Sequence, residues 1–393
     1  MTLDDLAQAL SGPPTATGRR VSTEGSLQQV TVFACVRLIA ESVGMLPLVL
    51  YRRIQPRGKE RATDHPLYSV LHDLPNPELT ALELYENLAG HLALWGNAYC
   101  EIEYDGAGRR RALWPLRPDY MTVEVDPETS QRVYVYQLPD GGMVSLPRYR
   151  VWHVRGWGTD PWVGKSPIAL AREAIGLSMA TEEYGARFFN NDSRPGGILT
   201  TDKTLSPEAA EKLKARWQAA HSGLTNAHRV AVMEQGLTWQ QIGIAPEEAQ
   251  FLETRRFQET QICQIYRVPP HMIGITERST SWGTGIEQQG LGFVAFTLMP
   301  YLLRISQSIS RDLLTAAERR ELFAEHLTVA LERGDINARY SAYNIGRNGG
   351  WLSVNDIREK ENMNPVEDGD TYLQPLYMTE LGGGSEADDE GQD

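Results

Sequence analysis

Residues 246–314, PEEAQFLETRRFQETQICQIYRVPPHMIGITERSTSWGTGIEQQGLGFVAFTLMPYLLRISQSISRDLL, decide the fold of this chain. The first third, residues 246–267, opens with Pro246 and two acids and has no glycine or internal proline, as expected for a helix. Its middle is polar almost all round, so this helix cannot bury an ordinary apolar stripe. It therefore faces water or packs against neighbours that are equally polar.

A polar loop and then an apolar helix follow. A Pro-Pro pair ends the first helix, and residues 276–285 (TERSTSWGTG) have no helical period, which predicts an exposed loop. From Ile286 onward the apolar residues recur at helical spacing, which predicts a packed helix with a kink at Pro300. The predicted buried positions are Leu291, Val294, Ala295, Leu298, Leu302, Ile305 and Ile309.

A second long helix lies upstream, and a small insert separates the two. Ser166 is a favourable N-cap and Pro167 a favourable first helical residue, and one helix can run from there to the breaker at 194–197. Between the helices, residues 198–245 predict a strand, the amphipathic helix Ser206–Ala220 and two further strands. This order predicts a small module carried at the end of a two-helix stalk.

The first 165 residues alternate between helix and strand patterns. Val30–Val43 is apolar enough to be a buried helix, and Ala81–Trp95 carries leucines and a tryptophan at helical spacing. The DGG sequence at 140–142 predicts a hairpin. The predicted strands lie at 46–52, from 97 onward, and at 121–125, 133–137, 143–145 and 151–154. These patterns assign the chain to the α+β class.

Composition limits the possible functions. The chain has 393 residues and a net charge of −13, which by itself argues against a nucleic-acid partner. Ten acids and no Lys or Arg follow Lys360, however, so residues 1–360 carry only −3 and the body is nearly neutral. Cys35, Cys100 and Cys263 lack zinc-ligand or disulfide spacing and are expected to be core thiols in a reducing compartment. No signal peptide or membrane-spanning segment is expected.

Enzyme motifs are weak. Gly164-Lys165-Ser166 resembles the end of a phosphate-binding loop, but the upstream glycine is one residue too far away and a proline follows. A turn followed by a helix N-cap explains these residues better. The eight histidines show no metal-binding or catalytic spacing, and no nucleophile elbow, paired-carboxylate signal or dinucleotide fingerprint occurs. The sequence therefore predicts no catalytic residue, no cofactor and no metal site.

Six short segments occur in a recognisable order. They are FFNNDSRPGGIL (188–199), LSPEAAEKLKARW (205–217), VMEQGLTWQQIG (232–243), EAQFLE (248–253), VPPHMIG (268–274) and TLMPYLLRI (297–305). Each alone is unspecific, but the ordered set resembles the portal protein family of tailed bacteriophages, of the long-tailed siphophage type. The resemblance covers about residues 25–375.

This resemblance implies a closed ring, twelvefold when assembled, at one capsid vertex of the virion, with assembly in the host cytoplasm. Double-stranded DNA would pass through the ring without sequence recognition, while the terminase large subunit supplies the ATP-driven force. A head-tail adaptor and the major capsid protein are further implied partners, and no membrane is involved. The implied division is a mobile N-terminal arm (1–24), an α+β wing (25–165), a stem helix (166–193), a clip (194–245), a second stem helix (246–267), a tunnel loop (268–285), a wing part with the long kinked helix and a strand (286–334), a short helical crown (335–375) and a disordered acidic tail (376–393).

Within the tunnel loop, five side chains are candidates for contact with DNA. Hydroxyl groups can bond phosphate oxygens without sequence preference, and an arginine adds a screened charge contact. The tryptophan either presses on the DNA or anchors the loop to the ring. The five candidates are Arg278, Ser279, Thr280, Ser281 and Trp282.

Two further groups are candidate interaction residues. Those of the stem form an ion-pair face between subunits or contact DNA in the channel, because acids and bases interleave there. Those of the clip dock the terminase and adaptor or, in the case of its tryptophan, pack the core of the clip itself. The stem candidates are Glu253, Arg255, Arg256 and Glu259, and the clip candidates are Lys212, Leu213, Arg216 and Trp217.

Other readings stay open on the sequence alone. Arg109-Arg110-Arg111 follows a turn sequence, which favours a solvated hairpin over a nucleic-acid patch. A ring or scaffold protein that binds no DNA is one alternative function. A nucleic-acid-processing enzyme with a cryptic site, assembled only in space, is the other.

Overall fold

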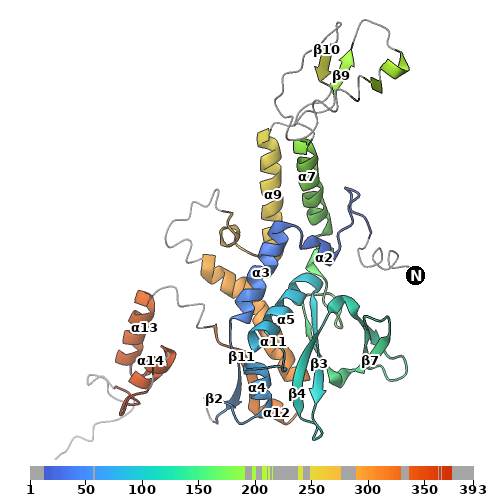
Figure 1. Cartoon of the computed structure of the whole chain (residues 1–393). Coiled ribbons are helices and arrows are strands. Elements are labelled where there is room, and N and C mark those ends of the chain that lie inside the picture. Colours follow the sequence, from blue (N-terminus) through green and yellow to red (C-terminus); the bar gives the residue numbers. More distant parts are fainter. Residues whose placement is uncertain are drawn as a thin grey trace, which may run out of the picture. The chain divides into compact units, whose positions relative to one another are not determined.

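The computed structural model describes residues 13–55, 58–190, 197–200, 206–209, 211, 212, 215, 238–241, 248–275, 289–328, 336–361, 363 and 365–373. The chain forms two compact units, Met1–Leu327 and Thr328–Asp393. Helices and β-sheets are both present, which confirms the predicted α+β class (Figure 1). The predicted acidic tail lies outside the described residues.

Two helices form the centre of the first unit, α3 (Val30–Gly44) and α5 (Ala81–Trp95). Their apolar side chains recur every three or four residues and are buried against each other. A capping box starts α5, in which Thr80 Oγ1 accepts a hydrogen bond from the Glu83 backbone and the Glu83 carboxylate accepts one from Thr80. Gly96, with φ 71°, ends it. Both helices confirm predictions from the sequence.

The first sheet joins segments that are far apart in the chain. Its strand order is β11-β1-β2, and β1 (Leu48–Arg53) pairs antiparallel with both neighbours, β2 (Lys59–Arg61) and β11 (Leu322–His326). Leu48 lies opposite His326, so the register buries the apolar side of the strands against the helices. A strand after the long helix was predicted, but its pairing with β1 follows only from the structure.

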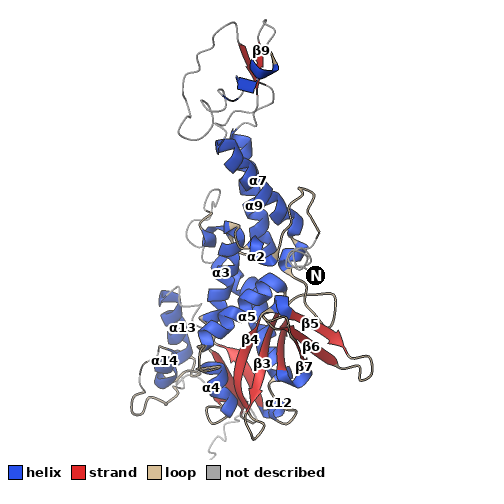
Figure 2. Cartoon of the chain, turned by 45° about the vertical axis from the view of Figure 1, so that its right-hand side comes forward, coloured by secondary structure: helices blue, strands red, loops and turns tan. Residues whose placement is uncertain are grey.

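Two more antiparallel sheets lie beside it, with strand orders β4-β3-β8 and β5-β6-β7 (Figure 2). Their shared core includes Tyr99 and Tyr134, whose ring centroids are 6.0 Å apart. The predicted DGG hairpin is confirmed, because Gly141 takes φ 86° in the turn between β6 and β7. The strands are β3 (Asn97–Tyr104), β4 (Arg110–Leu116), β5 (Met121–Val125), β6 (Arg132–Gln137), β7 (Met143–Pro147) and β8 (Val151–Arg155).

Short helices connect these elements. Proline at the first or second position starts three of them, since its fixed φ suits a helix start. They are α2 (Thr23–Ser26), α4 (Pro66–His72), η1 (Pro118–Tyr120), η2 (Arg148–Arg150), η4 (Pro270–Ile273) and α12 (Glu318–Glu321).

The helix predicted to run unbroken from Ser166 is interrupted. A short helix, α6 (Pro167–Leu170), is separated at Ala171 from α7 (Arg172–Asn190). Ser166 is the N-cap as predicted, and its hydroxyl also donates to the Leu94 carbonyl at 2.6 Å. No glycine or internal proline causes the break. We attribute it to the packing of α6 on α5, which no local pattern reveals.

The long apolar helix departs from α geometry just before Pro300. A π-helix, η5 (Phe293–Leu298), leads directly into α11 (Met299–Asp312). Pro300 has no N–H to offer the Phe296 carbonyl, and Arg267 Nη1 contacts that carbonyl at 3.5 Å instead. The sequence predicted a kink at Pro300, and the structure has a π-helix directly before this proline.

The predicted apolar stripe is buried from Leu298, the last residue of this π-helix, onward, and Val294 within the π-helix is partly buried. Leu298, Leu302, Ile305 and Ile309 are buried, whereas Leu291 is 55% exposed and Ala295 is also exposed. A π-helix has more residues per turn than an α-helix, so it rotates the earlier positions out of line with the later ones. The prediction assumed one continuous α-helix, and it was wrong for Leu291 and Ala295.

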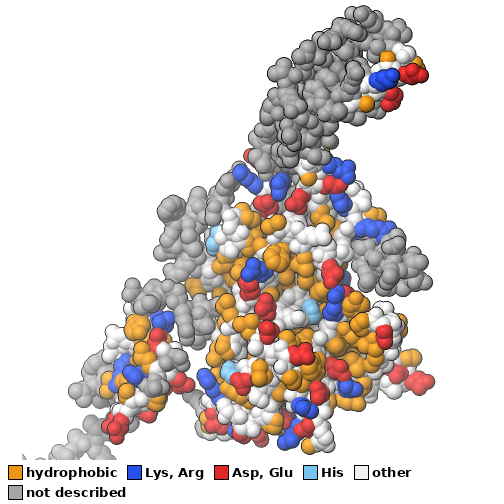
Figure 3. All heavy atoms as spheres, viewed as in Figure 1, with side chains coloured by type: hydrophobic (Ala, Val, Ile, Leu, Met, Phe, Trp, Pro, Cys, Tyr) orange, Lys and Arg blue, Asp and Glu red, His pale blue; other side chains and the backbone are white. Residues whose placement is uncertain are grey.

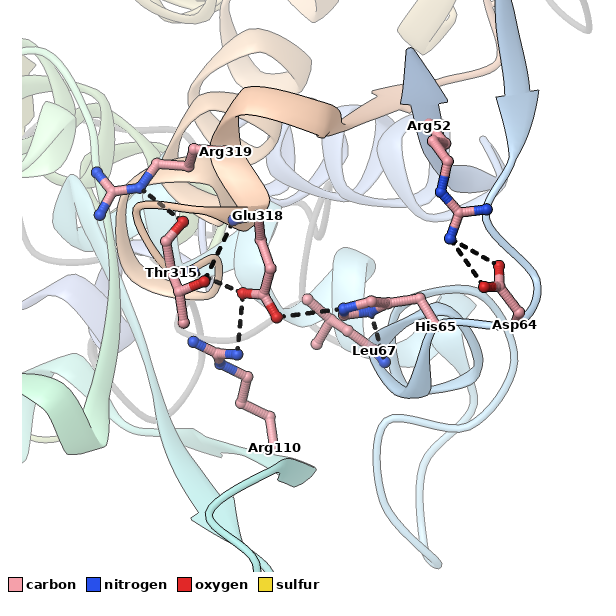
Figure 4. Close-up of polar contacts among 8 residues, drawn as sticks. All are labelled: Arg52, Asp64, His65, Leu67, Arg110, Thr315, Glu318 and Arg319. Carbon is pink, nitrogen blue, oxygen red and sulfur yellow. Dashed lines mark hydrogen bonds and ion pairs between the residues drawn. The ribbon is translucent and has the colours of Figure 1, made fainter. Parts of the chain in front are cut away.

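A partly buried carboxylate, that of Glu318, connects α12 to the body (Figure 4). Glu318 accepts a hydrogen bond from the Thr315 backbone at 2.6 Å and contacts Arg110 of β4 and His65, the N-cap of α4, both at 3.3 Å. Burial acts to raise the pKa of Glu318, but the hydrogen bonds from Thr315 and the nearby Arg110 hold that pKa below its ordinary value. The ionised carboxylate thus links three elements.

The second unit contains two helices, α13 (Ile336–Asn348) and α14 (Val354–Lys360). Ser353 and Asp356 form a capping box at the start of α14. Glu361, just after α14, binds Arg339 and Tyr343 of α13, each at 3.0 Å. Within the described ranges, no helix combines the length and the apolar character needed to cross a bilayer.

Candidate functional site: the helix pair and its neighbours

Helices α7 and α9 (Glu248–Tyr266) lie side by side and are called the helix pair below (Figures 1 and 2). Gln258 Nε2 of α9 donates to Thr181 Oγ1 of α7 at 3.0 Å, and Gln258 is 2% exposed. Gln29, the N-cap of α3, donates to Ser178 of α7 at 3.1 Å. Polar contacts therefore hold together helices that lack a broad apolar seam.

Burial changes sharply along α9. Residues 253–257 are all exposed, and among them the apolar Phe257 is 64% exposed. From Gln258 onward the side facing α3 is buried, including Ile262, Cys263 and Tyr266. Among the α9 side chains that the structure describes, packing on the body therefore begins at Gln258. The sequence predicted no buried apolar stripe in the middle of this helix, and the exposure of residues 253–257 agrees with that prediction.

The candidate stem charges occupy two sides of α9 rather than one. At 100° per residue, Arg255 and Glu259 share one side, and Glu253 and Arg256 share another. Glu253, Arg255 and Arg256 are exposed, and Glu259 is partly buried. Within the described part of the chain, Arg255 makes no ion pair. The structure thus leaves Glu253 and Arg255 exposed to other molecules or other copies of the chain.

Residues 13–22 of the predicted N-terminal arm run against α7. Thr15 is 5% exposed, and a Cβ added to Gly176 of α7 would lie 2.7 Å from its side chain. The Ala16 backbone donates to Glu173 at 3.0 Å, and Arg19 pairs with Glu183. Gly176 therefore permits this close approach, which sequence reasoning missed.

A thiol pair joins α3 to α9. Cys35 and Cys263 are both buried and free, and a hydrogen bond links their thiols. This hydrogen bond, together with burial, raises the pKa of Cys35, whereas the same bond lowers the pKa of Cys263. All three cysteines are buried, which confirms their prediction as core thiols. Their positions 228 residues apart in the sequence carried no signal of this contact.

The tunnel-loop candidates lie outside the described residues. These are Arg278, Ser279, Thr280, Ser281 and Trp282, within the undescribed segment 276–288. The described chain before it ends with η4 and with Gly274, whose φ of 88° ends that short helix. The described chain after it resumes at Gln289, one turn before η5.

The clip candidates are only partly described. Lys212 is exposed, and Leu213, Arg216 and Trp217 lie outside the described residues. The described strands of the insert, β9 (Gly197–Thr200) and β10 (Thr238–Gln241), pair antiparallel with Leu199 opposite Trp239. The predicted strand near 229–233 also lies outside the described residues.

The residues that suggested enzyme chemistry have structural roles. Gly164 donates its N–H to Asn97 Oδ1 at 2.7 Å, in a turn that leads to the N-cap Ser166. Burial lowers the pKa of His91 and of His326 to about 4, and burial together with Arg311 lowers that of His153 well below its usual value. Among the described residues, no group of His, Cys, Asp and Glu could hold a metal ion.

Comparison with known proteins decides the family. The phage portal protein family matches residues 30–362, which is most of the chain. The chain belongs to the phage portal protein family. This confirms the resemblance found in the sequence.

Individual portal proteins resemble this portal chain over most of their length. The probable portal protein of Streptomyces phage phiC31 is 34% identical over 383 residues, covering 94% of this chain and 83% of the relative. The portal protein of Enterobacteria phage HK97 is 32% identical, covering 95% and 89%. A solved neck of a native gene transfer agent particle, computed with C12 symmetry, matches with a TM-score of 0.58 and 26% identity, covering 87% and 93%.

Family membership settles the coarse role of the portal chain. Portal proteins are structural, non-enzymatic components of the virion at the portal vertex. The relatives in phages HK97 and phiC31 agree with the long-tailed phage type that the sequence indicated.

Proposed function

We propose that this chain is the subunit of a closed twelvefold ring at one capsid vertex, and that the ring forms the channel for double-stranded DNA packaging and ejection. The single observation that carries the proposal is the exposed run 253–257 of α9, where a long helix presents mostly polar side chains that its own chain does not cover. The C12 symmetry of the similar neck supports the ring and its number of copies.

Exposed apolar side chains on the first unit support self-association. Figure 3 shows hydrophobic side chains exposed on the part of the unit that carries α3. Val30 and Phe33 of α3 are 71% and 48% exposed, and Leu177 of α7 and Phe257 of α9 are 45% and 64% exposed. Neighbouring copies in a ring would cover such side chains, since large exposed apolar groups in clusters mark interaction sites.

The chemistry of the channel would be indifferent to sequence. A channel that passes any DNA avoids reading bases and avoids strongly basic walls. The near-neutral body and the interleaved charges of α9 meet this requirement. We place Arg278, Ser279, Thr280, Ser281 and Trp282 at the narrowest point, where hydroxyls and one charge touch passing phosphates.

The remaining surfaces would dock the assembly partners. The insert 194–245 would bind the terminase large subunit and the head-tail adaptor. The contact residues would be Lys212, Leu213, Arg216 and Trp217. The sheets and helices before Ser166 face the major capsid protein. The chain itself hydrolyses nothing, so the terminase supplies the force.

Imaging of the purified full chain tests the proposal. Native mass measurement and class-averaged electron micrographs are expected to show a closed ring of copies around an axial opening wide enough for a DNA duplex. Capsids assembled with the protein should then package DNA, and capsids assembled without it should not. A chain that stays monomeric, or a ring closed at its axis, would overturn the proposal.

A further inference from the structure

Three arginines line a cavity between β8, the loop after it and α11. The cavity holds about 350 Å³ and is bounded by Arg155 at the end of β8, by Arg304 and Arg311 of α11, and by one carboxylate, Asp160. The arginines come from positions 149 and 156 residues apart, so no sequence motif announces the cluster.

The charges of this cavity are not balanced inside the chain. Arg311 pairs with Asp312, but Arg304 donates only to the carbonyls of Arg155 and Gly156, at 3.1 and 2.9 Å. The Arg155 side chain has no hydrogen-bond or ion-pair partner within the described ranges, and its Nε is buried without one. Arg132, 8% exposed, stands nearby and has only the Trp162 ring, 5.0 Å away, as a described partner.

Unpaired positive charge in a half-buried position is unfavourable. Burial lowers the pKa of Arg155, and repulsion from Arg311 and Arg132 lowers it further. An ionised guanidinium out of water needs a partner, and a carboxylate fits its planar fork with two parallel hydrogen bonds. The cavity therefore has the chemistry of an oxyanion site whose anion is supplied from elsewhere.

Exposed tryptophans lie in the loop that contributes Asp160 and Val163 to this cavity. Trp157 and Trp162 of the connecting loop are 62% and 42% exposed. A neighbouring cavity of about 750 Å³ shares Gly156 and Arg304 with the first, and Trp157 and the 72% exposed Phe296 line it. Tryptophan and arginine around a pocket are typical of the residues that dominate protein–protein binding.

We propose that the pocket of Arg155, Arg304 and Arg311 receives a carboxylate from a second copy of this chain and so forms a contact between subunits. This inference rests on the proposed ring. Ten acids and no bases follow Lys360, and residues 1–360 carry a further −3, so a second copy offers carboxylates that its own bases do not neutralise. A concave pocket of this size admits one side chain, whereas the phosphates of a duplex lie on a convex surface and fit it poorly.

Substitution of Arg155 tests the pocket, because this side chain holds nothing else in the chain. Arg155→Glu is expected to raise the protein concentration at half-assembly at least tenfold, measured by mass photometry. Arg155→Met should weaken assembly as well, yet leave the unfolding temperature of the dissociated chain unchanged or higher, since it removes an unpaired charge. A purely structural arginine would lower that temperature instead.

The matched control is Arg109→Glu, which reverses an exposed arginine at the β3–β4 turn and should assemble like the wild type.

A second experiment measures the binding of a 30-base-pair DNA duplex by fluorescence anisotropy. Rings that form equally well with Arg155→Glu overturn the pocket but leave the proposed function intact. If Arg155→Glu forms intact rings that bind the duplex more weakly, the pocket binds DNA, and the proposed contact between subunits is wrong. A wild type that never self-associates overturns both proposals.

Discussion

At the scale of single residues, three glycines show how closely backbone segments approach beside the N-terminus of α6. A Cβ added to Gly96 would lie 2.1 Å from the Lys165 carbonyl oxygen, and one added to Gly164 would lie 2.1 Å from the Gly96 oxygen. The Gly156 N–H donates to Gly96 at 2.7 Å. These contacts fix the point where β8 gives way to α6 and the helix pair.

Gly96→Ala should therefore be strongly destabilising. The residue has φ 71°, which costs an alanine about 1 kcal/mol, and the contact with Lys165 is with backbone that cannot move aside. We expect a loss of more than about 3 kcal/mol in the free energy of unfolding, measured by urea denaturation. Gly108→Ala is the control, because Gly108 has φ 76° but nothing within 4 Å, so only the backbone cost of about 1 kcal/mol applies. Equal losses in both variants would refute the steric account.

Glu318 predicts a specific response to pH. Its folded pKa lies below its unfolded pKa, so its contribution to stability is complete above the unfolded value near 4.5 and is lost as the pH falls through the folded value. Glu318→Gln should cost about 1–2 kcal/mol at pH 7, because Arg110 and the Thr315 N–H lose a charged acceptor. The difference between variant and wild type should shrink below pH 4 in urea titrations. A difference that is constant between pH 7 and pH 3.5 would show that the charge of Glu318 is unimportant.

At the scale of elements, α9 combines two environments in one helix. Its second half is anchored by Ile262, Tyr266 and the contact of Cys263 with Cys35, whereas its first half presents charge on two sides. A helix of this kind is stable because the anchored turns hold the exposed turns in place. The exposed turns are then free to serve assembly.

Reversal of the stem arginines tests that role. Arg255→Glu combined with Arg256→Glu should raise the protein concentration for half-assembly about tenfold, equivalent to about 1.4 kcal/mol, and should make assembly more sensitive to salt. The helix itself should persist, because the anchored half is untouched, and circular dichroism checks this. Arg109→Glu with Arg111→Glu provides a control of equal charge change at the β3–β4 turn. Unchanged assembly of the α9 variant would show that these arginines do not lie between subunits.

At the scale of the whole molecule, the portal family accounts for features that a lone globular protein does not need. Such features are the polar helix pair, the exposed Phe257 and Phe296, and the unpaired Arg155. Each of them is unfavourable or unexplained in a single copy. Assembly into the proposed ring would give each a partner, which is why we propose that they lie at contacts between copies.

Alanine at Arg278 and at Ser279, Thr280 and Ser281 tests the channel. Ring formation should be unaffected, while the amount of DNA packaged per particle should fall at least severalfold, equally for DNA of different sequence, because phosphate contacts carry no base information. Packaged DNA is measured by nuclease protection. Alanine at the exposed Glu128 and Thr129 of the β5–β6 turn is the control. Normal packaging by the loop variant would remove these residues from the channel.

Much of the fold was accessible from local pattern. The bounds of α5 and β5 were predicted to the residue, because caps and periodicity define where such elements begin and end. The errors have identifiable causes. The break at Ala171 comes from packing on α5, and the exposure of Leu291 comes from a π-helix that shifts the helical period. Neither cause leaves a pattern in neighbouring residues.

The sequence by itself determined the α+β class, most of the elements, the core thiols, the polar character of α9 and, through its ordered motifs, the family. These properties depend on residues close together in the chain, where periodicity and caps act. Only the tertiary structure decided the pairing of β1 with β11, the contact of Cys35 with Cys263 and the cluster of Arg155, Arg304 and Arg311. Each of these joins residues more than 140 positions apart, and their meeting is set by the packing of whole elements rather than by any local preference.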